Sequence, residues 1–428
     1  MECRNSALCV FDKPGYQTDI LKTTYVEYFP VSSVDSEGPI EFLVPGAADD
    51  YLDLNDTCLK VVVKLKKSDG TAIKADGTDK CAFVNLAISS IFSDCATKIS
   101  DVQISGGDFD YGYTSYFLTA LQFQKQAQKS HLKVWGWMRD EAEKFDDDGN
   151  DGHEARMKMV NGSKSYELYG PLFTSIMRQD RFLLSSTDVR IKLSRASPQF
   201  ACMSFNGTAL KIDIEKCSLF VRRVSVNPSV IEGHAVGLAK RNAIYPIPRY
   251  QLVSHIITNG QLETVKDNLF PVETPKLLLV GMVDHTAFNG DYKKNPYNFQ
   301  NYNLKKLVLY RNGEIVHGHA LSPDYKNNQY TDAYTQTMSA LKFYNTDDSN
   351  GITYEEFKDG YNIYAFDLTS DNNANATYRN GSADKGLRLE MKFDAALKQN
   401  VNLLVFGMFD SHFELTKLRN VIVDHYGG

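Results

Sequence analysis

The first residues that could do chemistry form an acidic tract, Asp146-Asp147-Asp148-Gly149-Asn150-Asp151. Calcium prefers carboxylate and amide oxygens, and an EF-hand loop places them at alternate positions. With Asp146 at position 1, however, Asp151 stands where the sharp turn needs glycine, and Met157 stands where a bidentate glutamate is needed. A second tract, Thr346–Phe357, has threonine at position 1 and phenylalanine at position 12. We therefore expect solvated acidic loops and no metal site.

Histidine pairs and nucleophile motifs were the next candidates. His317 and His319 would share one face of a strand, but no third ligand follows at metal-binding spacing. Asp284-His285 has the composition of an acid–base pair, yet Asp284 ends an apolar strand, where a turn-forming aspartate is expected. The chain contains no GxSxG, P-loop or GxGxxG motif. We predict no catalytic residue, no metal ligand and no cofactor, and that the protein is not an enzyme.

Length and charge limit the class of protein. The 428 residues are about twice the ~200 of a large single sandwich, which predicts two domains. The net charge of −6 is opposite to that of a protein that coats nucleic acid, so we expect no strong direct binding to nucleic acid. Six arginines alternate with apolar residues, which favours an exposed sheet face or a subunit contact over a DNA groove. They are Arg178, Arg181, Arg190, Arg195, Arg222 and Arg223.

The chain carries no recognisable targeting signal. Its first 20 residues lack the apolar core and cleavage site of a signal peptide. The longest aliphatic run, Leu277–Val283, is too short for the ~20 residues of a membrane span. The seven cysteines show no CxxC spacing. We expect a protein that is made in the cytoplasm of a cell and folds there with reduced thiols and without disulfides.

Period-two alternation dominates the first half. In Cys58–Lys66, leucine and valine alternate with lysine, which predicts a half-buried strand ending at the turn Ser68-Asp69-Gly70. Helical spacing appears only at Tyr113–Gln128, and the acidic, glycine-rich stretch 139–163 predicts a long exposed loop. The other strands expected in this half are 24–29, 40–44, 83–92, 98–104, 166–168, 189–193, 200–203 and 210–224.

A short helix is expected to separate two halves. Asn227-Pro228 supplies an N-cap followed by proline at the first helical position, and Pro246 and Pro248 force extended chain afterwards. The second half again shows eight strand patterns, with a long tyrosine-rich excursion at 317–360. These strands are 251–258, 261–265, 276–283, 304–310, 361–368, 387–393, 402–409 and 414–423.

These patterns predict an all-β protein made of two tandem eight-stranded jelly-roll β-sandwiches, joined by a short helix and carrying long loop insertions. No residue-level repeat relates the halves, so the duplication is inferred from their layout alone. The expected segments are an N-terminal arm (1–20), a first jelly roll (21–226), a linker helix and turn (227–248) and a second jelly roll (249–428).

Four long segments resemble a known protein family. They are Gly170–Ala196 (GPLFTSIMRQDRFLLSSTDVRIKLSRA), Val221–Ile247, Val283–Val316 and Asn402–Tyr426. They are similar to proteins encoded by Polinton-type elements of animal genomes and to the hexon proteins of adintoviruses and adomaviruses. The resemblance extends from about Tyr25 to the end of the chain. The acidic loop Phe145–Glu154 departs from the family, so the resemblance says nothing about what that insertion contacts.

The resemblance implies a double jelly-roll major capsid protein of hexon type. Three copies would form a pseudo-hexagonal capsomer of an icosahedral shell of a DNA virus, with neighbouring capsomers, penton and minor capsid proteins as partners and the virion as its location. The residue patterns also allow two alternatives: a penton or other minor capsid protein, and a cellular two-domain β-sandwich binding module for carbohydrate or protein. Both tryptophans, Trp135 and Trp137, lie in one loop region, whereas glycan sites usually expose tryptophan.

Removal of divalent metal should leave the stability unchanged, because both calcium-like tracts lack the acidic ligand at position 12. We expect the same melting temperature with and without EDTA. A drop of more than ~5 °C, which corresponds to roughly 1 kcal/mol or more in domains of this size, would contradict this prediction.

Overall fold

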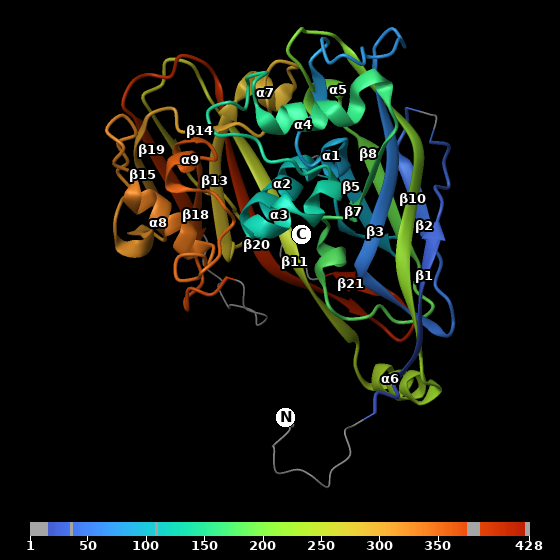
Figure 1. Ribbon diagram of the computed structural model, residues 1–428. Coiled ribbons are helices and arrows are strands. Elements are labelled where there is room, and N and C mark those ends of the chain that lie inside the picture. Colours follow the sequence, from blue (N-terminus) through green and yellow to red (C-terminus); the bar gives the residue numbers. More distant parts are fainter. Residues whose placement is uncertain (1–15, 35–36, 108–109, 375–385, 424–428) are drawn as a thin grey trace, which may run out of the picture.

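The computed structural model describes residues 16–34, 37–107, 110–374 and 386–423 (Figure 1). Most of the predicted N-terminal arm, including Cys3 and Cys9, lies outside the described residues. The alternation expected in Cys58–Lys66 is confirmed, since Leu59, Val61, Val63 and Leu65 are fully buried while the lysines between them reach the surface. This segment belongs to the longer strand β3, which forms the centre of the first sandwich.

The first sandwich consists of two antiparallel sheets, with strand orders β1-β10-β3-β7 and β2-β8-β5-β6. Their inward-facing side chains form its core. The strands are β1 (Ile20–Tyr28), β2 (Ile40–Val44), β3 (Asp50–Lys67), β5 (Phe92–Ile99), β6 (Val102–Ser105), β7 (Tyr166–Pro171), β8 (Val189–Arg195) and β10 (Leu210–Val226).

The second sandwich repeats this arrangement, with strand orders β11-β20-β13-β18 and β12-β19-β15-β16, and β21 added beside β20. Its strands are β11 (Ala243–Ile257), β12 (Glu263–Lys266), β13 (Leu277–Asp284), β15 (Leu304–Arg311), β16 (Glu314–Ile315), β18 (Ile363–Asp367), β19 (Leu387–Phe393), β20 (Val401–Leu415) and β21 (Val421–Val423). Two short extra ladders pair β4 (Cys81–Phe83) with β9 (Cys202–Ser204), and β14 (Phe299–Gln300) with β17 (Asp359–Gly360).

Both halves therefore share one topology. Leaving aside the short ladders and β21, the main strands of each described half pair as first-eighth-third-sixth in one sheet and second-seventh-fourth-fifth in the other. This is the jelly-roll order, and the predicted all-β double jelly roll is confirmed. In each half the long insertion joins the fifth strand to the sixth.

The predicted separating helix is present as α6 (Pro228–Lys240). The Asn227 side chain accepts a hydrogen bond from the Ser229 amide at 3.1 Å, as an N-cap should. No side chain of α6 is fully buried, and the helix lies at one end of the molecule (Figure 1). Strand β11 begins at Ala243, before residue 249, where the second jelly roll was expected to start. The domain boundaries themselves stay predictions.

The two insertions are more ordered than predicted. The helical pattern at Tyr113–Gln128 is confirmed as two helices, but the loop expected at 139–163 contains a helix and buried polar residues. The strands expected at 83–92 and 200–203 are each partly helical. The helices are α1 (Ala87–Ser90), α2 (Tyr111–Gln122), α3 (Lys125–Lys129), α4 (Asp151–Val160), α5 (Pro198–Ala201), α7 (His285–Asn289), α8 (Thr331–Ala340) and α9 (Tyr354–Lys358), with 3-10 turns at His131–Trp135, Asn161–Ser163, Ser175–Arg178 and Val316–Gly318.

Candidate functional site

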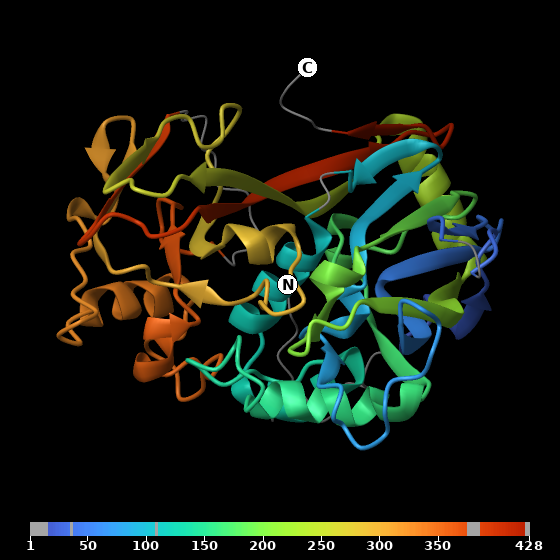
Figure 2. The same cartoon turned by 90° about the horizontal axis from the view of Figure 1, so that it is seen from above.

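The first insertion joins the two sandwiches through an aromatic layer. Helix α2 lies between the halves of the molecule (Figures 1 and 2). Its Tyr116 stacks on Tyr297 with ring centroids 4.2 Å apart, and its Phe117 contacts Phe299 and Phe406 at 5.2 and 5.5 Å. Buried aromatic pairs of this kind contribute about 0.5–1.5 kcal/mol each beyond the area they bury. The hydrophobic core is therefore continuous across both halves.

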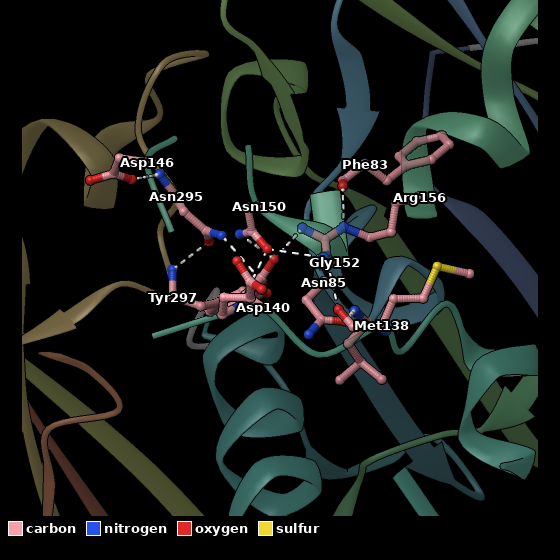
Figure 3. A network of polar contacts seen from close by, with 12 residues as sticks. Phe83, Asn85, Met138, Asp140, Asp146, Asn150, Gly152, Arg156, Asn295 and Tyr297 are labelled. Atoms are coloured by element: carbon pink, nitrogen blue, oxygen red, sulfur yellow. Dashed lines mark hydrogen bonds and ion pairs between the residues drawn. The ribbon is translucent and has the colours of Figure 1, made fainter. Parts of the chain in front are cut away.

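A buried ion pair lies beside this layer (Figure 3). Arg156 of α4 is 2% exposed, and its Nη2 donates to Asp140 Oδ1 at 2.7 Å. Its Nε and Nη1 donate to the carbonyl oxygens of Phe83 and Met138 at 2.9 and 2.6 Å. A buried ion pair is tolerated only when further hydrogen bonds satisfy its remaining polar atoms, and these carbonyl contacts meet that condition for the guanidinium.

Asp140 extends the pair into the second sandwich. Its carboxylate accepts hydrogen bonds from the side-chain amides of Asn150, at 2.8 Å, and Asn295, at 3.5 Å. Its carbonyl oxygen accepts from the Tyr361 hydroxyl at 2.6 Å, a contact between residues 221 positions apart. Three residues of this network, Asp140, Asn150 and Arg156, belong to the first insertion, and two, Asn295 and Tyr361, belong to the second half of the chain. We call these five residues, Asp140, Asn150, Arg156, Asn295 and Tyr361, the polar junction.

Two glycines permit the close packing of the polar junction. A Cβ atom on Gly152 would come within 2.5 Å of the Arg139 carbonyl oxygen. Gly360 has a φ of +88°, and a Cβ there would come within 2.3 Å of the Phe145 ring. Phe145 itself packs edge-on against Tyr361 at 5.0 Å. A larger residue at position 152 would push α4 away from residues 139–140, and one at position 360 would push Phe145 of the insertion away from the second sandwich.

His153 is enclosed next to the polar junction. It is 1% exposed, and its ring meets Phe205 edge-on at 4.8 Å. Burial, followed by the charge of Arg156, lowers the pKa of His153 to about 3. Because the unfolded chain binds this proton near pH 6.5, the histidine makes folding less favourable as the pH falls below about 6.5.

In the first calcium-like tract, side-chain oxygens interact with donor groups of the protein itself. Asp146 accepts from the Asn295 backbone amide at 2.6 Å and from Asn298 Nδ2 at 2.8 Å, and partial desolvation of its carboxyl raises its pKa. Asp148 pairs with Lys80, and Asn150 caps α4 by accepting from the Gly152 amide. The expectation of a solvated acidic loop is confirmed for residues 146–149, which are exposed, whereas Asn150 at the start of α4 is fully buried.

The second tract also has a structural role. Asn350 is fully buried, and Thr353 and Glu356 form a capping box at the start of α9. Phe357, at the position of the missing ligand, is a core residue. Most tyrosines of this tyrosine-rich insertion pack within the chain. Tyr325 and Tyr330 are each 3% exposed, whereas Tyr344 is exposed.

The histidine candidates do not come together. His319 contacts Asp332 at 3.1 Å, while His317 stacks on Phe366. Asp284 caps α7 and accepts from Lys294 at 2.6 Å, and His285 contacts Asn402 instead of Asp284. Throughout the described ranges, no group of three or more His, Cys, Asp or Glu side chains is arranged to hold a metal ion.

The arginine series and the cysteines are accommodated within the chain. Arg222 pairs with Asp53 and Asp56, and Arg195 donates to the carbonyl oxygens of Val34 and Gly38. The five cysteines that the structure describes are free thiols.

None of the helices in the described residues is long and apolar enough to cross a membrane.

Sequence reasoning missed the polar junction. Its members are separated widely along the chain, so no local motif contains them. One signal was available: Asn150, followed by Asp151 and Glu154 in the next turn, is a helix N-terminus pattern and predicts α4.

Comparisons with known proteins place this architecture. No protein-family model matches the chain. An uncharacterised protein of Caenorhabditis elegans, F54H12.2, is 24% identical over 424 residues, covering 96% of this chain and 99% of the relative. Its name assigns no activity.

Solved structures resemble the chain over its whole length. A chain of the Sputnik virophage cryo-EM structure gives a TM-score of 0.66 at 11% identity, covering 100% of this chain and 93% of that chain. The PBCV-1 virus capsid gives 0.60 at 10% identity, covering 97% and 99%. The mavirus major capsid protein gives 0.57 at 12% identity, covering 99% and 94%. At these identities the likeness shows a shared fold.

Replacing Arg156 by methionine should destabilise the protein by about 3–5 kcal/mol, because it leaves the Asp140 carboxylate buried without its charged partner. Urea unfolding measures this loss. The Asp140→Asn variant should also be destabilised, and the double variant should lose less than the sum of the two single losses, because the residues share one interaction.

Lys158→Met is the matched control on the same helix. Lys158 pairs with Glu154 at the surface, so its loss should leave the unfolding midpoint unchanged within error. Equal losses for Arg156→Met and Lys158→Met, or strictly additive losses at Arg156 and Asp140, would contradict the role assigned to the buried pair.

Proposed function

We propose that this chain is a viral major capsid protein whose double jelly roll forms the repeating unit of a protein shell. One observation carries the proposal: the likeness to the Sputnik, PBCV-1 and mavirus structures covers at least 97% of this chain, and therefore includes both sandwiches and the helices between them. The mavirus structure is that of a major capsid protein. A shell needs no catalytic residue, and we propose no enzymatic role.

The proposed capsid protein is of the Polinton, adintovirus and adomavirus type. The four segments that resemble this family support that assignment, together with the double jelly roll. In this proposal residues 1–20 are an arm, 21–226 and 249–428 are the jelly rolls, and 227–248 join them. The chain would reside in the virion capsid, contacting neighbouring capsomers and penton and minor capsid proteins.

An exposed apolar row on the first sandwich supports self-association. β1 is an edge strand of its sheet. Four large apolar or aromatic residues along it and just beyond it, which we call the apolar row, are more than half exposed: Leu21, Tyr25, Phe29 and Val31. Exposed apolar side chains at a sheet edge are typical of a protein contact. This row, rather than the buried tyrosines of the second insertion, is the surface we propose for contacts between copies.

The purified protein should be a trimer with a hexagonal outline. Two sandwiches held rigidly by the polar junction give six lobes when three chains close into a ring, and closed rings avoid open-ended filaments. A permanent contact of this kind should bury more than ~2,000 Å² in total. Light scattering should report three times 48.2 kDa, and negative-stain images should show hexagonal top views.

The same measurement separates the alternatives. A pentamer would favour a penton protein, and a stable monomer at micromolar concentration without hexagonal views would favour a cellular binding module over the capsid proposal. The Tyr25→Asp variant tests the apolar row. It should weaken the trimer while keeping the far-UV circular dichroism of the parent protein.

Deletion of residues 1–15 should leave folding intact and impair assembly of capsomers into shells. Chain termini are commonly ordered only by a partner, and the first strand of the sheet, β1, begins at Ile20, after this segment. Soluble trimers that no longer form shells are the expected product. An insoluble truncated protein would show that the segment belongs to the core.

A further inference from the structure

We propose that a polar cleft at the loop end of the second sandwich binds a neutral carbohydrate. The cleft has a volume of about 630 Å³ and lies around α7 and β14, at the end of the molecule opposite α6 (Figure 1). Volumes of this size suit small ligands. The proposal goes beyond the capsid function and does not depend on it, because the cleft is formed within one chain.

A carboxylate and an amide stand side by side on the wall of the cleft. Gln300 of β14 and Asp359 of β17 are direct cross-strand neighbours, and both line the cleft. Side chains at such positions lie on the same face of the ladder, with Cβ atoms about 4.5–5.5 Å apart. A carboxylate accepts hydrogen bonds and an amide both donates and accepts, which matches two adjacent sugar hydroxyls.

Asp359 keeps acceptor capacity for a ligand. Within the described residues, one side chain donates a hydrogen bond to Asp359: the Asn301 amide, at 3.4 Å. No lysine, arginine or histidine of the described residues lies within ion-pair distance of this carboxylate. Burial raises the pKa of this carboxyl. Hydroxyl donors from a ligand would replace the water that Asp359 has partly lost.

Neighbouring side chains hold the wall in place without a ligand. Gln300 donates to Asn298 at 2.6 Å, and Asn298 donates in turn to Asp146 at 2.8 Å. On the other side, Gln399 donates to Asp284 at 2.6 Å. A site whose polar groups are already fixed loses little entropy when a ligand binds.

An aromatic side chain stands next to these groups in a strained turn. Tyr302 is half-buried in the cleft wall, and Tyr302 and Asn303 have φ values of 46° and 52°, in the left-handed region that favours glycine. Non-glycine residues held in this region cost free energy and concentrate at functional sites. The Asn303 amide donates to Asn301 Oδ1 at 2.7 Å, which fixes the turn. The tyrosine ring supplies an apolar face for the C–H face of a sugar ring.

The charge of the cleft selects a neutral ligand. Its lining contains the carboxylates of Asp146, Asp284 and Asp359 against the ammonium groups of Lys326 and Lys358. Lys326 is paired with Asp394 and Asp284 is paired with Lys294, which leaves the carboxylates of Asp146 and Asp359 against Lys358. The remaining excess of negative charge disfavours phosphate, sulfate and sialate groups.

The test is a glycan array probed with the full-length protein, carrying neutral and acidic glycans, followed by titration of the best-bound neutral oligosaccharide. Asp359→Asn and Gln300→Ala should each weaken binding about tenfold or more, the cost of losing a charge-assisted or paired hydrogen bond. The matched control is Asp267→Asn, which removes a carboxylate from a distant exposed site on the same sandwich. It should bind as the parent protein does.

Three outcomes would overturn the proposal: no binding to any neutral glycan, binding restricted to sialylated or sulfated glycans, and neutral binding that Asp359→Asn and Gln300→Ala leave unchanged. The melting temperature of each variant shows that it is folded. The oligomeric state, measured separately, tests the capsid proposal, so failure of one inference is distinguishable from failure of the other.

Discussion

The buried pair between Arg156 and Asp140 determines how the first insertion meets the second sandwich. Taking two charges out of water costs several kcal/mol for each ion, and the pair is tolerated only because carbonyl oxygens and side-chain amides complete its hydrogen bonding. Those requirements position the segment that carries Phe145 and Asp146. The contacts of that segment with Tyr361 and Asn295 then set the relation between the two halves.

Two sandwiches of identical strand order become one body through their insertions. Each insertion leaves its sandwich at the equivalent place, between the fifth and sixth main strands, and the two meet in the space between the halves. Arg139 of the first insertion pairs with Glu356 of the second at 2.7 Å. The aromatic layer around Tyr116 excludes water from the same region. A flexible tether would leave the angle between the sandwiches free, whereas this packing fixes it, as the proposed shell role requires.

The burial of the tyrosines differs from what their sequence positions imply. Tyr325 and Tyr330 lie in a polar, surface-like stretch, yet they are buried, because Tyr325 hydrogen-bonds to Tyr364 and both rings stack in the insertion's own core. One row of exposed apolar residues lies instead along the edge strand β1, where the strand pattern alone does not distinguish an edge from a centre. Subunit contacts are therefore better sought at β1 than in the tyrosine-rich insertion.

Local patterns in the chain were enough to predict most of the strands, the capped helix after Asn227 and the all-β class, because alternation and capping depend on neighbours one to four residues away. They also predicted two jelly rolls, since the order of strands and insertions is a linear property. The polar junction was beyond their reach. Asp140 and Arg156 flank the exposed acidic stretch 146–149 and yet are buried, because Asn295 and Tyr361 reach Asp140 only after both sandwiches have folded. Charge in a sequence predicts exposure only when no distant partner replaces the solvent, and only the tertiary structure brings that partner into place.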